Sequence, residues 1–399
     1  MSTVAPPPNR RLSAVLRDEG ARVTPLELFF DLVFVLAFTQ CTALMAKEPT
    51  WEGLAKGLLV LGVMWWAWVG YAWLTSVVDP EEGAVRIAMF AAMAALLVVS
   101  LCIPEAFSDL GLLFALAYGG VRLGQIALFV LASRDDPGLR HSVVGLGIST
   151  LVGTSILVAA SFADHELQGA LWLLALALDM GGPLFIDSSG WRLAPSHFAE
   201  RHGLIMIIAL GESIVAVGVG AEAGVDVGVA VAAVLGVAVA ASQWWIYFDV
   251  VALVAERRLT DAETGKEQNE IARDSYSYLH FPMVAGIVLI ALGMKKTLGH
   301  VEDPLKLVPA VALLDGAALY LLAHVAFRLR NVHSWNVRRL VAAGAILALI
   351  PLAVEIPSLV TLAILAAIFA VLIAYEAVRY AEARDRVRHR LAHDLAPPG

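Results

Sequence analysis

Apolar runs of about twenty residues recur along the whole chain, and they limit what it can fold into. A helix needs about 20 mainly apolar residues to cross a bilayer. The segments that meet this length are 26–46, 53–77, 84–104, 109–132, 142–162, 168–187, 197–221, 226–254, 276–298, 305–328, 338–355 and 358–379. The sequence therefore predicts an all-α integral membrane protein with about twelve transmembrane helices.

The composition favours the same class and excludes several others. Hydrophobic residues make up 59% of the chain and charged residues 16%, with a mean hydropathy of +0.75; soluble domains carry about 25% charged residues. The net charge of −8, with scattered Lys and Arg, offers no basic surface and predicts no nucleic-acid partner. Two cysteines, Cys41 and Cys102, exclude a disulfide scaffold and a thiolate metal cage. A disulfide between them stays open.

The distribution of basic residues predicts the orientation. If the N-terminus is cytoplasmic and every segment crosses, 22 of the 28 Lys and Arg residues fall at cytoplasmic ends. Five fall on the opposite face, and Arg122 is left within the membrane. Cytoplasmic loops of membrane proteins carry this excess, so we expect both termini in the cytoplasm.

Four regions follow from this topology. We expect a cytoplasmic N-terminal segment (1–25), a first six-helix repeat (26–190), a second six-helix repeat (191–379) and a basic cytoplasmic tail (380–399). Because six is even, the repeats would share one topology, with a symmetry axis along the membrane normal. The aromatic stretches WWAW at 65–68 and WWIYF at 244–248 favour this correspondence, although interfacial belts explain them equally well. The polar loop 255–275 is predicted to be a partly helical cytoplasmic connection.

Arg122 lies at the centre of the fourth apolar segment and needs a partner or a wet cavity at that depth. Tyr118 and Gln125 share its helix face. Its counter-charge should be an acid of similar depth, for which the candidates are Asp179, Glu212 and Asp315. The GGP triplet at 181–183 either breaks the helix of Asp179 beside a cavity or simply ends it.

The first apolar segment, LELFFDLVFVLAFTQ, carries two acids one turn apart. Glu27 suits the first turn of a helix, with Thr24 as its cap and Pro25 at the first helical position. Asp31 lies a turn deeper, beyond the reach of capping. In the seventh segment His197, Arg201 and Glu212 share one face, and Glu212 is interpreted as the counterpart of Asp31 and a candidate proton or cation site.

Metal chemistry is not indicated by this sequence. His197 and His202 are five residues apart and point to different helix faces, so with Glu200 they do not form a zinc hydrolase motif. The sequence contains no recognisable nucleophile constellation either. We therefore predict no enzyme activity and no cofactor.

These segments also resemble a known family. TPLELFFDLVFV (24–35) and HFAERHGLIMIIALGESIV (197–215) are similar to the two hallmark segments of the bacterial low temperature requirement A family, and DPEE (79–82) and ASQWWIYFD (241–249) also fit. The resemblance implies a multi-pass protein of the bacterial cytoplasmic membrane with no settled substrate. It gives emphasis to Glu27, Asp31, His197, Glu200, Arg201 and Glu212. His202 stands where an aromatic residue is expected.

The leading functional hypothesis is a proton- or cation-coupled secondary transporter of an unknown small solute. Asp31 and Glu212 would bind and release the coupling ion, and Arg122 would pair with an acid or an anionic substrate. One alternative is a cation channel, because FFDLVFV is similar to the Phe-Ser-Asp motif of two-repeat potassium channels, with Phe30 in place of the serine. The other is a structural or stress-related membrane protein that transports nothing. Lipid is the expected partner, and a homo-oligomer stays open.

Overall fold

Helices account for nearly all of the described structure. The computed structural model describes residues 22–81, 83–185, 190–221, 224–379 and 381, and within them no β-strand forms beyond one isolated bridge between Pro304 and Pro357. Most of the predicted N-terminal segment and basic tail lies outside these residues. Eleven helices of the described chain are long and apolar enough to cross a membrane. The all-α membrane fold class is confirmed.

The helices of the first half are α1 (Pro25–Lys47), α2 (Trp51–Val77), α3 (Gly83–Cys102), η1 (Ile103–Glu105), α4 (Gly111–Ala132), α5 (Pro137–Ala160) and α6 (His165–Phe185). Those of the second half are α7 (Pro195–Gly220), α8 (Val227–Phe248), α9 (Val251–Thr260), α10 (Lys266–Ile271), the π-helix η2 (Ala272–Tyr278), α11 (His280–Gly299), α12 (Leu307–Val332), α13 (Val337–Ala348), α14 (Ile350–Ala353) and α15 (Ser358–Arg379). The predicted connection 255–275 is indeed partly helical, since it contains the second half of α9 and the whole of α10.

The predicted segment 338–355 is not a single membrane-length helix. It forms α13 and α14, which are separated at Leu349, next to Pro351. The isolated bridge nevertheless pairs Pro357 with Pro304, just before α12 begins. The short helices therefore bring the chain back from the end of α12 to its beginning. Eleven long spans are found among the described residues, and the predicted segment 338–355 forms two shorter helices instead of a twelfth.

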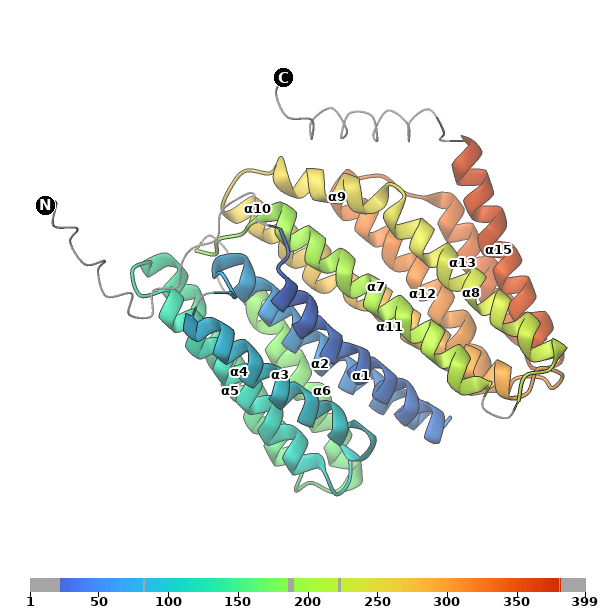
Figure 1. Ribbon diagram of the computed structural model, residues 1–399, viewed down its shortest axis with the longest axis horizontal. Coiled ribbons are helices and arrows are strands. Elements are labelled where there is room, and N and C mark those ends of the chain that lie inside the picture. Colours follow the sequence, from blue (N-terminus) through green and yellow to red (C-terminus); the bar gives the residue numbers. More distant parts are fainter. Residues whose placement is uncertain (1–21, 82, 186–189, 222–223, 380, 382–399) are drawn as a thin grey trace, which may run out of the picture.

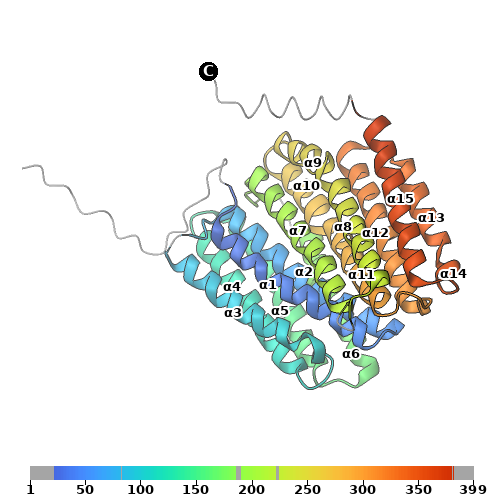
Figure 2. The same ribbon diagram turned by 45° about the vertical axis from the view of Figure 1, so that its right-hand side comes forward.

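The helices gather into two groups that follow the sequence. Figure 1 shows α1–α6 together on one side and α7–α15 on the other, and the turned view in Figure 2 keeps the same division. Within the first group α1 packs on α2 and α3, α3 on α4, α4 on α5, and α5 on α6. Within the second, α7 packs on α8 and α11, α11 on α12, α12 on α13, and α13 on α15. The order of packing is thus the same in both groups.

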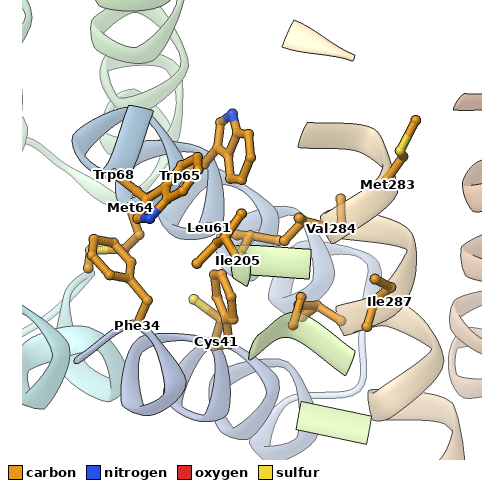
Figure 3. Packing of buried hydrophobic residues seen from close by; sticks show 14 of the residues in the cluster. Phe34, Cys41, Leu61, Met64, Trp65, Trp68, Ile205, Met283, Val284 and Ile287 are labelled. Atoms are coloured by element: carbon orange, nitrogen blue, oxygen red, sulfur yellow. The ribbon is translucent and has the colours of Figure 1, made fainter. Parts of the chain in front are cut away.

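Four helices, two from each group, meet at the centre of the molecule. Figure 3 shows side chains of α1, α2, α7 and α11 packed together, among them Phe34, Trp65, Trp68, Ile205 and Val284, and all of these are buried. Trp65 and Trp68 therefore belong to the core and not to an interfacial belt. In the second aromatic stretch Trp244 and Trp245 are exposed on the surface of the bundle.

Two further expectations are settled by the helices. Helix α6 continues through the GGP triplet to Phe185, so a break beside Asp179 is wrong. At this end of the helix the Met180 carbonyl accepts a hydrogen bond from the Tyr278 hydroxyl, and the Pro183 carbonyl accepts one from the Arg273 guanidinium. The second expectation concerns the disulfide between Cys41 and Cys102 that the sequence left open. Both cysteines are buried and free, so no disulfide joins them.

The closest helix contact, between α11 and α12, gives a first prediction. A β-carbon at Gly286 would lie 2.6 Å from the carbonyl oxygen of Gly316, which is backbone and cannot rotate away. We expect Gly286→Ala to lower stability in detergent by about 1–3 kcal/mol, the usual cost of overpacking, as a lower thermal unfolding midpoint. Gly120→Ala is the matched control, because nothing lies within 4 Å of its new β-carbon. Equal midpoints for the two variants would contradict this close packing.

Candidate functional site

The two helix groups are joined along α1 and α7 by polar contacts, which we call the α1–α7 seam. Glu27 contacts His197, Asp31 contacts Arg201, and Thr39 contacts Glu212. The partners are separated by 170, 170 and 173 residues. Because residue numbers rise together on both helices, α1 and α7 run in the same direction. Each contact joins a helix of the first half to a helix of the second.

Glu27 has two roles, one on each carboxylate oxygen. Its Oε2 accepts from the backbone N–H of Thr24 at 2.9 Å, while the Thr24 hydroxyl accepts from the backbone N–H of Glu27, which makes a capping box. Its Oε1 accepts from His197 Nε2 at 2.9 Å and lies 3.5 Å from Arg201 Nη1. The predicted capping role is therefore present, but the same carboxylate also binds the second half.

Asp31 is the deeper acid of this cluster and is fully buried. Its Oδ1 accepts from Arg201 Nη2 and, at 2.9 Å, from the indole N–H of Trp68. The guanidinium of Arg201 also donates to Thr75 at 2.8 Å and lies 5.6 Å from the centre of the Trp68 ring. A buried charge is stable only when it is paired and hydrogen-bonded. Both charges meet that condition only while α1, α2 and α7 stay together.

Glu212 lies further along the seam, about 16 Å from Arg201 by helical rise. Its side chain is 2% exposed, and Oε2 accepts from the Thr39 hydroxyl at 2.5 Å. Thr42, also on α1, faces the same carboxyl group. Within the described chain no Lys or Arg lies within 4 Å of it. This carboxyl group is thus buried beside hydroxyl groups without an ion-pair partner.

Arg122 has its own partner inside the first half. Its Nη2 donates to Asp179 Oδ1 at 3.0 Å and to the Thr150 hydroxyl at 2.9 Å, and its Nη1 donates to Gln125 Oε1 at 2.7 Å. The second oxygen of Asp179 accepts from the Tyr118 hydroxyl at 3.3 Å. Among the three acids considered as its counter-charge, Asp179 is the partner.

The predicted site residues therefore do not converge. They form three separate groups: the Glu27–Asp31–His197–Arg201 cluster, Glu212 with its threonines, and the Arg122–Asp179 pair. Glu200 lies outside all three, exposed near the beginning of α7, where it accepts from the backbone N–H of Val23. Asp31 and Glu212 are not equivalent in position either, since they are the seventh residue of α1 and the eighteenth of α7.

A cluster of buried aromatic and histidine rings beside Trp68 could not be predicted from the sequence. The centre of the His202 ring lies 4.8 Å from the ring centre of Trp68, 5.1 Å from that of Tyr276 and 5.1 Å from that of His280. His280 Nε2 is 2.8 Å from the Tyr247 hydroxyl. His202 thus occupies an aromatic environment, which fits the residue type expected there. His280 is also fully buried. Isolated histidines in apolar segments carry no signal of such a cluster.

Eleven membrane-length helices, with buried charges paired between them, define a multi-pass integral membrane protein. The family model described as bacterial low temperature requirement A protein (LtrA) matches residues 22–374, and the chain belongs to this family. The chain is also 29% identical over 308 residues to the uncharacterized protein RA0937 of Rhizobium meliloti (strain 1021), which covers 74% of each chain. No solved structure matches.

Arg201 gives the prediction for this cluster. Arg201→Gln leaves two buried carboxylates without their guanidinium, and removing one partner of a buried pair costs about 3–5 kcal/mol. We expect a large drop in the thermal unfolding midpoint in detergent. The double variant Asp31→Asn/Arg201→Gln should unfold at a higher temperature than Arg201→Gln, because one of the stranded charges is gone.

The matched control is Arg192→Gln. This exposed arginine pairs with Asp136 at the surface, where ion pairs contribute about 0–1 kcal/mol. A double variant less stable than Arg201→Gln would contradict the assignment of Asp31 as the partner of Arg201.

Proposed function

We propose that this protein is a proton- or cation-coupled secondary transporter whose coupling ion binds at Glu212. The observation that carries the proposal is the position of this carboxyl group. It is buried in the α1–α7 seam, among hydroxyl groups and without an ion-pair partner in the described chain. A carboxylate at such a depth is stable when it holds a proton or a cation. Binding and release of that ion would change the charge between the two halves.

For the Asp31–Arg201 pair we propose a structural role instead of ion binding. A guanidinium stays charged under all physiological conditions, so its carboxylate partner has a permanent counter-charge and less reason to take up an ion. The pair holds α1 and α7 together, and the two states of a carrier would differ in how these helices meet. This division revises the interpretation in which Asp31 and Glu212 were equivalent ion sites.

Two six-helix repeats are part of the same proposal. The helix packing follows the same order in both halves, and α1 and α7 run parallel, as the first helices of two parallel repeats must. Transporters built from such repeats bind solute and ion near the interface between them. The buried charges of the seam lie at that interface, and both termini are expected on the cytoplasmic side.

Reconstituted protein tests the coupling site. We expect wild-type proteoliposomes to give transient currents on a solid-supported membrane when a panel of small solutes is added under an inward proton or sodium gradient. Glu212→Gln keeps the side-chain shape but cannot hold an ion, so its gradient-dependent current should fall at least tenfold. Glu302→Gln, an exposed acid between α11 and α12, is the matched control.

Three results would overturn the proposal. Unchanged gradient-dependent currents in Glu212→Gln would show that the ion binds elsewhere. Unitary currents in planar bilayers, far larger than the turnover of a carrier, would show a channel. Transport without any dependence on the gradient would exclude coupling.

A further inference from the structure

A cavity between the first half and the π-helix η2 of the second half is lined by residues with polar atoms that the fold itself does not use. It has a volume of about 50 Å³ and is bounded by α2, α4, α5, the end of α6 and the π-helix η2. By volume it has room for roughly four water molecules. It lies beside the Arg122–Asp179 pair, away from the seam residues Glu27, Asp31 and Glu212, none of which lines it.

Three N–H groups on residues lining this cavity have no acceptor among the described residues. They are Nε of Arg122, Nε2 of Gln125 and Nε1 of Trp66. The side chains are 1%, 0% and 3% exposed, so bulk water does not satisfy them. A buried donor without an acceptor costs free energy comparable to a lost hydrogen bond. Three such N–H groups on residues that line one cavity indicate a ligand that accepts hydrogen bonds.

The charges near the cavity favour a negative ligand. Asp179 neutralises Arg122. On the η2 side Arg273, which lines the cavity, and Arg330 share one carboxylate, that of Asp274, at 2.8 and 3.0 Å. Among these groups one positive charge is left over. Guanidinium and amide N–H groups bind carboxylates with short, charge-assisted hydrogen bonds.

The remaining walls are apolar and aromatic. Trp73 and Trp191 line the cavity with Val69 and Leu146. The indole N–H of Trp73 is already used, because it donates to the Ser277 hydroxyl at 2.9 Å. Such walls would accept a short apolar body, whereas a compact inorganic dianion such as sulfate would gain nothing from them.

We propose that this cavity is a binding site for a small organic carboxylate, held by the N–H groups of Arg122, Gln125 and Trp66 with its apolar part against the tryptophans. The inference rests on the proposed transporter function for its biological meaning, since the carboxylate would be the transported solute. Binding itself does not depend on transport and can be measured separately.

The test uses purified full-length protein in detergent with trifluoroacetate as the probe. Binding is followed by fluorine NMR line broadening, with trifluoroacetamide as the uncharged analogue of the same shape. We expect saturable binding of the carboxylate, binding of the amide at least tenfold weaker, and no displacement by a tenfold excess of sulfate. No binding of trifluoroacetate, or an amide that binds equally well, overturns the proposal, as does displacement by sulfate.

Variants locate the site. Trp66→Phe removes one N–H and keeps an aromatic ring at this position, so the affinity for trifluoroacetate should fall about tenfold or more, as for a lost hydrogen bond to a charge. Gly70→Ala should abolish binding, because its β-carbon would lie 2.3 Å from Gln125 Nε2 and 2.6 Å from Arg122 Nη1. Trp172→Phe is the matched control, a buried tryptophan of the same half that does not line the cavity.

The outcomes separate the two proposals. Unchanged affinity in Trp66→Phe, with the thermal unfolding midpoint of the wild type, overturns the carboxylate site. Saturable trifluoroacetate binding lost in Trp66→Phe, together with an absence of gradient-driven currents, supports the site and overturns the transporter. Gradient-driven currents evoked only by uncharged or cationic solutes, together with no saturable binding of trifluoroacetate, support the transporter and overturn the carboxylate site.

Discussion

The pairing of Arg201 with Glu27 and Asp31 is the interaction on which the arrangement of the two halves depends. All three side chains are fully buried, so none can turn to water if the contact is lost. In a lipid environment there is no hydrophobic force that drives helices together, and packing and polar contacts decide which helices meet. The charges of α1 and α7 therefore act as a specific attachment. The apolar core of α1, α2, α7 and α11 surrounds that attachment and keeps it dry.

The number and limits of the helices could largely be predicted from the sequence, because the length needed to cross a bilayer is a strong and local constraint. Eleven of the predicted segments correspond to long helices. The exception, 338–355, is divided at Leu349 beside Pro351, and a hydropathy pattern does not register such a division. At the GGP triplet the sequence suggested a break, but the helix is continuous there. Helix α6 continues through Pro183 and ends two residues later, at Phe185.

The candidate site was predicted residue by residue but not as an arrangement. Each buried charge was recognisable by its cost in an apolar segment, and Asp179 was among the expected partners of Arg122. Their grouping depends on the rotation and register of helices far apart in sequence, which periodicity within one helix does not contain. Thus Arg201 was expected on the same face as Glu212, yet its partners are on α1. The unused N–H groups of Gln125 and Trp66 were equally hidden, since any glutamine or tryptophan in a membrane helix is ordinarily satisfied.

The division of labour between the two oxygens of Glu27 has a mechanical consequence. One oxygen fixes the first turn of α1 through Thr24, and the other holds α7 through His197. The place where the chain enters its first helix is therefore rigidly connected to the boundary between the halves. A force that acts on the chain just before Thr24 would reach that boundary directly, through Glu27 and through the contact of the Val23 backbone with Glu200 of α7.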